Sequence, residues 1–347
     1  MTEKTESYLR RNWKLIVNLI TLAALAILIY AIRHQLVQTL KDLRHVNLWI
    51  LFLMVPMQLL NYHAQTKLYQ GLFGIVGNKL RYWPLYRASV ELNFVNHVFP
   101  SGGVSGVSYF GVRMKDSDIT GSKATLVQVM KVALVILSFE ILLVAGLFFL
   151  AIVGKASGFV LFIAGALSSL MLLGTAGFAY IIGSKKRINA FFIAVTKGLN
   201  KIIQMVRPRH PETINIERSH RAFDDLHENY MAYRRHRGEL RAPFWWAVMA
   251  NVTEVATLYI VYIAFGELVN VGAVILAYAV ANFAGFVSVL PGGVGIYEAL
   301  MTAVLSAGGV PAAVSLPVTV MYRVVNTLIQ LPPGYYFYHK TIRGEKA

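Results

Sequence analysis

The chain is a series of long apolar stretches separated by short charged segments. A helix that crosses a membrane needs about 20 mostly apolar residues. Several stretches approach or exceed that length, and most of them contain one acidic or basic residue or none. The stretches that we expect to cross the membrane are 15–32, 48–60, 132–154, 156–184, 242–266, 268–297, 299–322 and 324–338.

The segment 88–112 is also hydrophobic, but it is rich in Gly, Asn and Ser and is more typical of a broken or re-entrant element. Basic residues precede the first stretch, follow the second, dominate the loop 184–241 and follow the last stretch. Basic loops stay on the cytoplasmic side. All four basic segments can be cytoplasmic if 88–116 enters and leaves the membrane from the cytoplasmic side. The pattern predicts an all-α polytopic membrane protein with about eight transmembrane helices, one re-entrant element, an uncleaved first span and both termini in the cytoplasm.

Composition supports a membrane class and removes several others. Hydrophobic residues make up 56% of the chain and charged residues only 14%, with a mean hydropathy of +0.54. The net charge of +16 would suggest nucleic acid in a soluble protein. Here positive-inside loops and anionic lipid explain the charge more simply, and the expected location is the cell membrane, either inner or plasma membrane. There is no Cys, which excludes disulfides, thiolate metal sites and Cys nucleophiles.

We interpret residues 1–347 as a single membrane domain, because the loop 184–241 is too short for a separate catalytic domain. This loop carries 13 Lys and Arg against 6 Asp and Glu. Its first half has apolar residues from Ile188 to Ile203 at helical spacing, which predicts a basic amphipathic helix on an anionic membrane surface. Leu spacing in 34–46 predicts a short interfacial helix on the opposite side.

Two segments share a motif that breaks helices. Each has Asn-Phe, a few apolar residues, and then Pro followed by Gly-Gly-Val. Pro removes a backbone donor and clashes with the preceding turn, and Gly-Gly permits unusual backbone conformations. The predicted helix-break residues are Pro100, Gly102 and Gly103 in the first copy and Pro291, Gly292, Gly293 and Gly295 in the second.

Paired breaks in corresponding halves of a chain indicate a transporter-like site at a repeat interface. We therefore expect two related halves whose breaks lie at similar depth. Ordinary packing of helices through small residues is the alternative reading.

The segments "FPSGGVSG" and "LPGGVGIYEALM", on a polytopic frame with a basic central loop, resemble the lysylphosphatidylglycerol synthase transmembrane region. This is the flippase-like domain that forms the N-terminal part of the multiple peptide resistance factor. The resemblance covers roughly residues 10 to 340 and implies lipid translocation. Ser101 stands where many members have Arg, and Val104 where they have an acid. The family's C-terminal aminoacyl-transferase domain is not expected here, and neither is synthase activity.

Ionisable residues inside a membrane are costly and are functional candidates by default. Glu298 and Arg323 follow the second break. A reversal near Gly308–Pro311 would make their helices antiparallel, so the two charges are predicted to pair. Glu91 and Lys131 flank the first break as a possible counterpart pair. The alternative is that each pair only neutralises itself and fixes helix register. Polar residues that would line the same headgroup path are Asn93, Asn96, His97 and Asn282.

The leading function is a flippase that moves a phospholipid or polyprenyl-linked lipid between leaflets. The alternative is a non-transport accessory subunit that presents polyprenyl-phosphate sugar to a glycosyltransferase. We find no catalytic motif, no metal-ligand spacing and no nucleotide motif, and we expect no cofactor. The expected partner is an anionic phospholipid or a polyprenyl-phosphate-linked lipid. Further candidates are a second copy of the chain and a glycosyltransferase or synthase, and no nucleic acid is expected.

Overall fold

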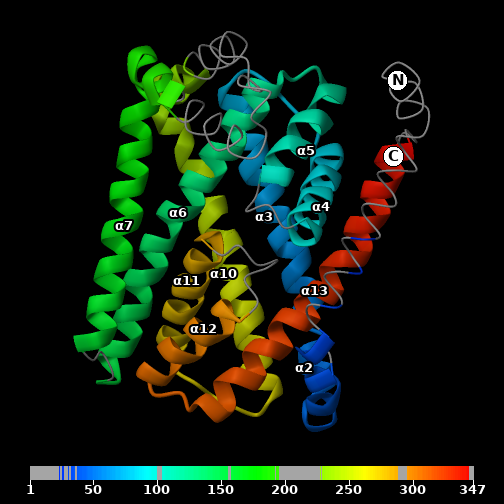
Figure 1. Cartoon of the computed structure of the whole chain (residues 1–347), viewed down its shortest axis with the longest axis vertical. Coiled ribbons are helices and arrows are strands. Elements are labelled where there is room, and N and C mark those ends of the chain that lie inside the picture. The colour runs from blue at the N-terminus through cyan, green and yellow to red at the C-terminus, as the bar shows by residue number, and fades with distance from the viewer. Residues whose placement is uncertain are drawn as a thin grey trace, which may run out of the picture.

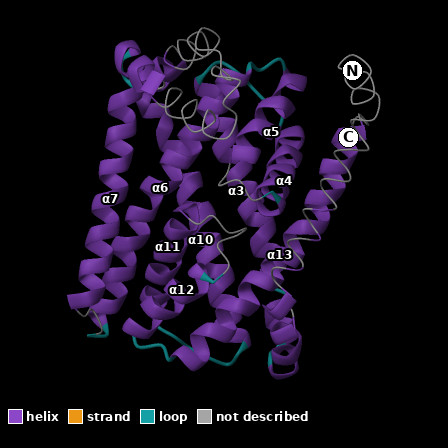
Figure 2. Ribbon diagram, in the orientation of Figure 1, coloured by secondary structure: helices purple, strands orange, loops and turns teal. Residues whose placement is uncertain are grey.

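The computed structural model describes residues 37–99, 104–154, 158–191, 229–287 and 295–343, and a few residues outside these ranges. Every regular element in the described part is helical (Figure 2). The long helices are α3 (Met54–Ile75), α6 (Gly121–Ile152), α7 (Gly158–Ile182), α10 (Arg241–Ala264) and α13 (Ala312–Arg343). The shorter helices are α2 (Leu48–Leu51), α4 (Tyr82–Val98), α5 (Val104–Met114), α11 (Val271–Val287) and α12 (Ile296–Ala307).

The chain is an all-helical polytopic membrane protein. The helices α6, α7, α10 and α13 are each long and apolar enough to cross a membrane, and α11 and α12 are shorter apolar helices. The outer surface carries large exposed apolar side chains, such as Phe162 at 73% and Leu173 at 71% exposed, both on α7. A soluble surface of this kind would be unusual, whereas lipid tails cover it favourably.

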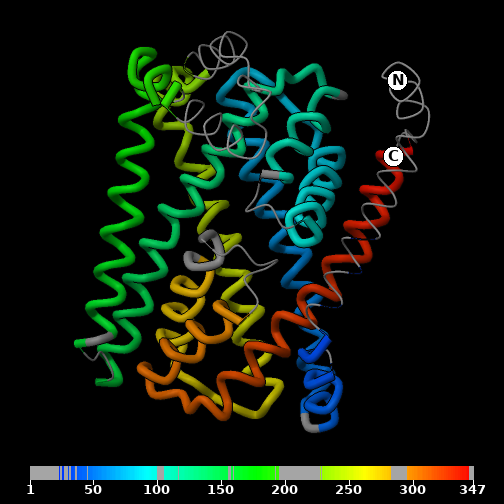
Figure 3. The backbone as a smooth tube through the Cα atoms, in the orientation of Figure 1, coloured from blue at the N-terminus to red at the C-terminus, as the bar shows by residue number. Residues whose placement is uncertain are grey.

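Two short helical hairpins enter the bundle from opposite ends (Figures 1 and 3). The helices α4 and α5 form the first hairpin, and their outer ends lie at the upper end of the view in Figure 1. The helices α11 and α12 form the second hairpin, and their outer ends lie at the lower end. Opposite directions of entry are the arrangement expected of an inverted repeat.

The first hairpin agrees with the re-entrant element expected for 88–116. Around the second, the helix boundaries differ from the expected ones. Three spans were expected between 268 and 338, but this stretch forms α11, α12 and the long α13. Hydropathy alone misses the reversal at Gly308–Pro311, where Gly309 has a φ of +86° and allows the chain to turn.

The expected loop helices are described only in part. Residues 37–42 are helical and Leu43–His45 form a 3-10 turn, within the helix predicted over 34–46. Residues 185–191 are helical, but most of the predicted amphipathic segment lies outside the described residues. Toward one end of the bundle lie the ends of α3, α7 and α13 and the start of α10 (Figure 1). These are helix ends that adjoin the basic segments 79–87, 184–241 and 339–346.

The hydrophobic core has two main clusters, one around each hairpin. The larger joins α6, α10 and α13 to the second hairpin through residues such as Tyr278, Met301 and Met321. The other joins α3 and α6 to the first hairpin through residues such as Leu72 and Phe110. Each hairpin is therefore held by packing against long helices, and α13 contacts both α4 and α12.

Helices α6 and α11 approach so closely that their backbones touch. A Cβ on Gly272 would collide with the carbonyl oxygen of Gly146 and lie 3.0 Å from the backbone nitrogen of Leu150. Small residues allow this contact, which is common between membrane helices. We expect Gly272→Ala to lower the free energy of unfolding by about 2 kcal/mol or more, because neither backbone can yield without moving a helix.

Thermal unfolding of the purified protein in detergent measures this effect. Gly174→Ala on α7 is the matched control, since nothing lies within 4 Å of the Cβ it would add. Equal melting temperatures for the two variants would show that the α6–α11 contact is looser than the structure has it.

Candidate functional site

Glu298 and Arg323 form a salt bridge at the inner end of the second hairpin. Glu298 is the third residue of α12, and Arg323 faces it from α13. Both side chains are largely enclosed, with Glu298 7% and Arg323 16% exposed. The Arg323 guanidinium also lies 4.8 Å from the centre of the Tyr297 ring. The structure therefore brings together the two charges that the sequence suggested, while their role toward a headgroup stays a prediction.

The Glu298 carboxylate also holds the start of α12. Its Oε2 accepts a hydrogen bond of 2.6 Å from the Gly295 backbone N–H, and its Oε1 accepts one of 2.9 Å from Gln35 Nε2. Gly295 has a φ of +89°, a conformation that favours glycine, and the chain turns there into α12. A carboxylate near a helix N-terminus is further stabilised by the helix dipole. Glu298 thus links α12, α13 and the segment that precedes α2.

The expected pairing of Glu91 with Lys131 is wrong. Glu91 instead forms a salt bridge of 2.9 Å with Arg113 Nε and accepts hydrogen bonds of 2.7 Å from Tyr109 and 2.9 Å from Thr341. The physical reason is the hairpin itself, because antiparallel packing of α4 and α5 places Arg113 beside Glu91. The side chain of Glu91 is 1% exposed, so all of its donors come from the protein.

Lys131 lies elsewhere, on the face of α6 that meets α3. Its ammonium donates a hydrogen bond of 3.0 Å to Gln65 Oε1 and lies 5.0 Å from the centre of the Tyr69 ring. Gln65 in turn donates to Asn61, which bonds to α10 through Thr253 Oγ1 and the Ala250 carbonyl. Within the described part of the chain, Lys131 makes no salt bridge. It belongs to a polar network that ties α3, α6 and α10 together.

The two ion pairs lie at different levels of α13. Arg323 and Thr341 are 18 residues apart in this helix, which corresponds to about 27 Å at 1.5 Å per residue. The Glu298–Arg323 pair is therefore deep in the bundle, and the Glu91–Arg113 pair lies nearer the end where α13 terminates. The counterpart suggested by the sequence, Glu91 with Lys131, is not formed, and the ion pair that Glu91 does form lies away from the Glu298–Arg323 pair.

A third acid, the half-buried Glu254 of α10, lies near several tyrosines. Its Oε2 accepts a hydrogen bond of 2.9 Å from the Tyr322 hydroxyl, and the Asn326 side chain lies beside it. The tyrosines within electrostatic range of Glu254 come from α3, α11, α12 and α13 and are Tyr62, Tyr278, Tyr297 and Tyr322. Among the described residues, no Lys or Arg forms a salt bridge with Glu254.

The predicted polar residues divide between the two hairpins. His97, one residue before the end of α4, bonds to the Asn93 carbonyl at 2.8 Å and lies within electrostatic range of Arg323. The Asn93 side chain lies next to the Tyr62 hydroxyl. Asn282 donates to the Tyr278 carbonyl at 2.8 Å and its side chain lies near Tyr297. The inner end of the first hairpin therefore approaches the ion pair at the inner end of the second.

Asn96 lies on the face of α4 that packs against α5. A Cβ on Gly106 would collide with the Asn96 side chain, so the glycine permits close contact of the two helices. Asn96 is exposed, and it belongs to the packing within the hairpin rather than to the ion-pair region.

Six of the predicted helix-break residues lie outside the described residues, namely Pro100, Gly102, Gly103, Pro291, Gly292 and Gly293. The helices on either side are described: α4 ends at Val98 and α5 begins at Val104, while α11 ends at Val287 and α12 begins at Ile296. Both copies of the motif thus fall between two short helices. Their predicted relative depth and symmetry are not tested by these residues.

Sequence reasoning missed the tyrosines and the partner of Glu91, which is Arg113. Tyr62, Tyr297 and Tyr322 lie within apolar stretches, where an aromatic ring gives no sign of a polar role. A signal for Arg113 did exist, since Glu91 and Arg113 are each eleven residues from Gly102. A reversal centred there would place them side by side. No group of three or more His, Asp or Glu in the described part could hold a metal ion.

Comparisons with known proteins point to one family. The model described as the lysylphosphatidylglycerol synthase transmembrane region matches residues 16–334. A UPF0104 membrane protein of Methanothermobacter thermautotrophicus is 31% identical over 80 residues, which cover 23% of this chain and 24% of that protein. A UPF0104 membrane protein of Methanocaldococcus jannaschii is 23% identical over 162 residues, which cover 46% of each. The chain thus spans less than half the length of the curated relatives that it matches.

Proposed function

The chain belongs to the family of the lysylphosphatidylglycerol synthase transmembrane region, and on that premise we propose that it moves a lipid with an anionic headgroup between the two leaflets. The lipid is a phospholipid or a polyprenyl-phosphate-linked lipid. We further propose a cell-membrane location with both termini in the cytoplasm, which follows from the positive-inside rule. On this proposal the domain itself is a transporter and not an enzyme.

The observation that carries the proposal is a buried ion pair between the second hairpin and α13, the helix against which α4 of the first hairpin also packs. Glu298 and Arg323 lie at the inner end of one hairpin, and His97 at the inner end of the other is within electrostatic range of Arg323. Charged side chains that are kept inside a membrane protein commonly mark a substrate path. Hairpins that enter from opposite ends would give this path access to both leaflets.

The mechanism we infer uses polar side chains in place of water. A headgroup that leaves the interface loses hydration, and this cost is offset only by hydrogen bonds and charges along its path. Arg323 supplies a cation for a phosphate, while Asn93 and Asn282 supply amide donors from opposite hairpins. The acyl tails remain in the surrounding lipid. Movement of the first hairpin against α13 would open the path alternately to the two sides, as in other inverted-repeat transporters.

The test is lipid movement by the purified chain alone. Vesicles that contain headgroup-labelled phosphatidylglycerol are treated with a quencher that cannot cross the membrane, and the protected fraction is followed over time. We expect label in the inner leaflet to become accessible faster than in protein-free vesicles, in proportion to the amount of protein. An accessory subunit that only presents lipid to a glycosyltransferase would leave the protected fraction unchanged.

A further inference from the structure

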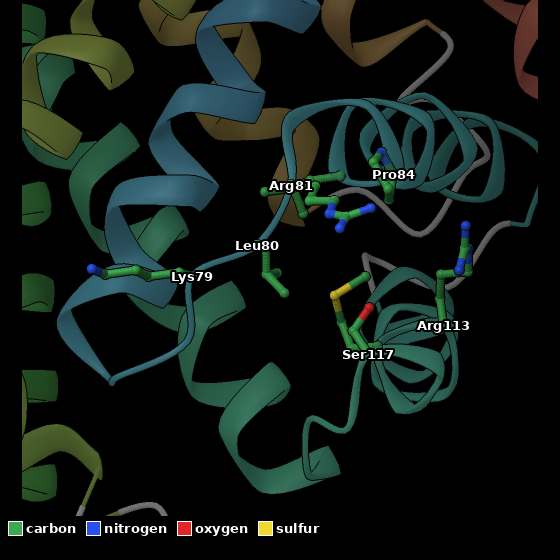
Figure 4. Close-up of a pocket in the computed structure, with 8 residues that line it drawn as sticks. Lys79, Leu80, Arg81, Pro84, Arg113 and Ser117 are labelled. Atoms are coloured by element: carbon green, nitrogen blue, oxygen red, sulfur yellow. The ribbon is translucent and has the colours of Figure 1, made fainter.

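A small pocket lies where the loop after α3 meets the outer end of the first hairpin (Figure 4). Its volume is about 200 Å³. The walls come from the α3–α4 loop, the first turn of α4, the end of α5 and the turn that follows α5. The lining residues are Lys79, Leu80, Arg81, Pro84, Leu85, Arg113, Met114 and Ser117.

Positive charge faces this pocket from two sides. In Figure 4 the Arg81 guanidinium points toward the space between the loop and α5, and Arg113 stands on the opposite wall. The Lys79 ammonium points away from that space. No acidic residue lines the pocket. Arg81 is exposed and makes no salt bridge within the described part of the chain.

The rest of the lining is mostly apolar. Leu85 and Met114 are buried, with 1% and 2% exposed surface, and Leu80 and Pro84 complete the wall. Ser117 adds one hydroxyl group. Beside the pocket, Trp83 and Val112 are 65% and 64% exposed, as expected of residues that contact lipid near the membrane surface. A cationic rim over an apolar wall suits an amphiphile whose polar end carries a phosphate.

We propose that this pocket binds the phosphate of an anionic lipid at the membrane surface, before the headgroup enters the path between the hairpins. Guanidinium groups are well suited to phosphate because they donate two parallel hydrogen bonds. The proposal rests on the proposed function for the identity of the lipid, but not for the phosphate site itself. Arg113 also forms the salt bridge with Glu91, and Glu91 accepts a hydrogen bond from Thr341 of α13. A phosphate bound to Arg113 would therefore change the contact between α5 and α13.

The test compares two loop variants with the same change in charge. Arg81→Gln removes the guanidinium that points into the pocket, whereas Lys79→Gln removes a nearby cation that points away. Binding of dihexanoyl phosphatidylglycerol to the purified full chain is measured by calorimetry in a zwitterionic detergent. We expect Arg81→Gln to weaken binding about tenfold, since a charge-assisted hydrogen bond contributes that much. Lys79→Gln should change it less than twofold.

Equal weakening by both variants would overturn the proposal, because a diffuse surface charge would then suffice. Unchanged binding to Arg81→Gln would overturn it as well. Inorganic phosphate serves as a second probe: a much lower affinity than for the lipid identifies a lipid ligand, and an equal affinity identifies a free phosphate in the same site. Calorimetry measures binding and requires no lipid movement. The pocket proposal is therefore tested by the binding experiment alone, and the flippase proposal by the vesicle experiment alone.

Discussion

Vesicles containing the Glu298→Gln variant should show lipid movement at least about tenfold slower than wild type, although the variant folds. Gln keeps an oxygen that can accept from the Gly295 N–H, and Gln is also a favoured residue at this capping position. Arg323 remains over the Tyr297 ring and is 16% exposed, so loss of its anion should cost only about 1–2 kcal/mol of stability. The unbalanced Arg323 should then hold an anionic headgroup too tightly to release it.

The rate is measured with labelled phosphatidylglycerol in vesicles, and folding by the elution profile and melting temperature in detergent. Glu140→Gln is the matched control, because Glu140 is a carboxylate on α6 that bonds to Ser168 of α7, away from both hairpins. A folded Glu298→Gln protein with wild-type rates would remove this residue from the mechanism. A charge swap of Glu298 and Arg323 should not restore activity, because it removes the acceptor for Gly295.

The Arg113→Gln variant should lose about 3–5 kcal/mol of stability, more than any other change at the first hairpin. It leaves the Glu91 carboxylate, which is 1% exposed, with hydroxyl donors but no cation. Glu91→Gln should be much milder, at about 1–2 kcal/mol. The Gln side chain can still accept from Tyr109 or Thr341, and Arg113 is 14% exposed near the outer end of the hairpin.

The difference in stability between Arg113→Gln and Glu91→Gln is measured by thermal unfolding of the two single variants and the double variant in the same detergent. The double variant, which removes both charges, should be more stable than Arg113→Gln alone. Equal losses for the two single variants would mean that water or lipid reaches Glu91, and that its burial is less complete than the structure indicates.

Much of the fold could be predicted because apolar length and Pro-Gly punctuation are local signals. The first hairpin was expected from its Gly, Asn and Ser content between two apolar segments. The second was harder to recognise, because 268–297 carries no charge and reads as one full span. Its repeated motif at Pro291 was the better guide than hydropathy, since it marks where a helix cannot continue.

The candidate site was predicted only where sequence order limits the choice of partner. Glu298 and Arg323 were matched because a turn at Gly308–Pro311 brings neighbouring helices together. Lys131 was assigned to Glu91 because both flank the first break in the sequence. In the structure the Lys131 side chain leaves α6 on the face that meets α3, where it bonds to Gln65. Helix rotation depends on packing against other helices, and a sequence without its neighbours does not contain that information.

The tyrosines around Glu254 show the same limit in another form. Tyr62 comes from α3, which is distant in sequence from α12 and α13, the consecutive helices that carry Tyr297 and Tyr322. Each is unremarkable in its own apolar segment, because a buried hydroxyl is acceptable wherever a partner exists. Only the assembled bundle shows that Tyr322 bonds to Glu254 and that Tyr62 and Tyr297 lie near the same carboxylate.

The most direct test of lipid movement by the hairpins is a reversible cross-link in this cysteine-free chain. A Cβ on Gly334 of α13 would lie 2.5 Å from the Phe94 Cβ of α4. A disulfide needs a Cβ–Cβ distance of about 3.8 Å, so the bond between Phe94→Cys and Gly334→Cys forms once the two helices separate by about 1 Å. Labelled lipid movement is measured in vesicles containing the oxidised and then the reduced double variant. The account predicts movement at the protein-free rate when oxidised and clearly faster movement after reduction. Equal rates in the two states, or no movement above protein-free vesicles in either, would contradict it.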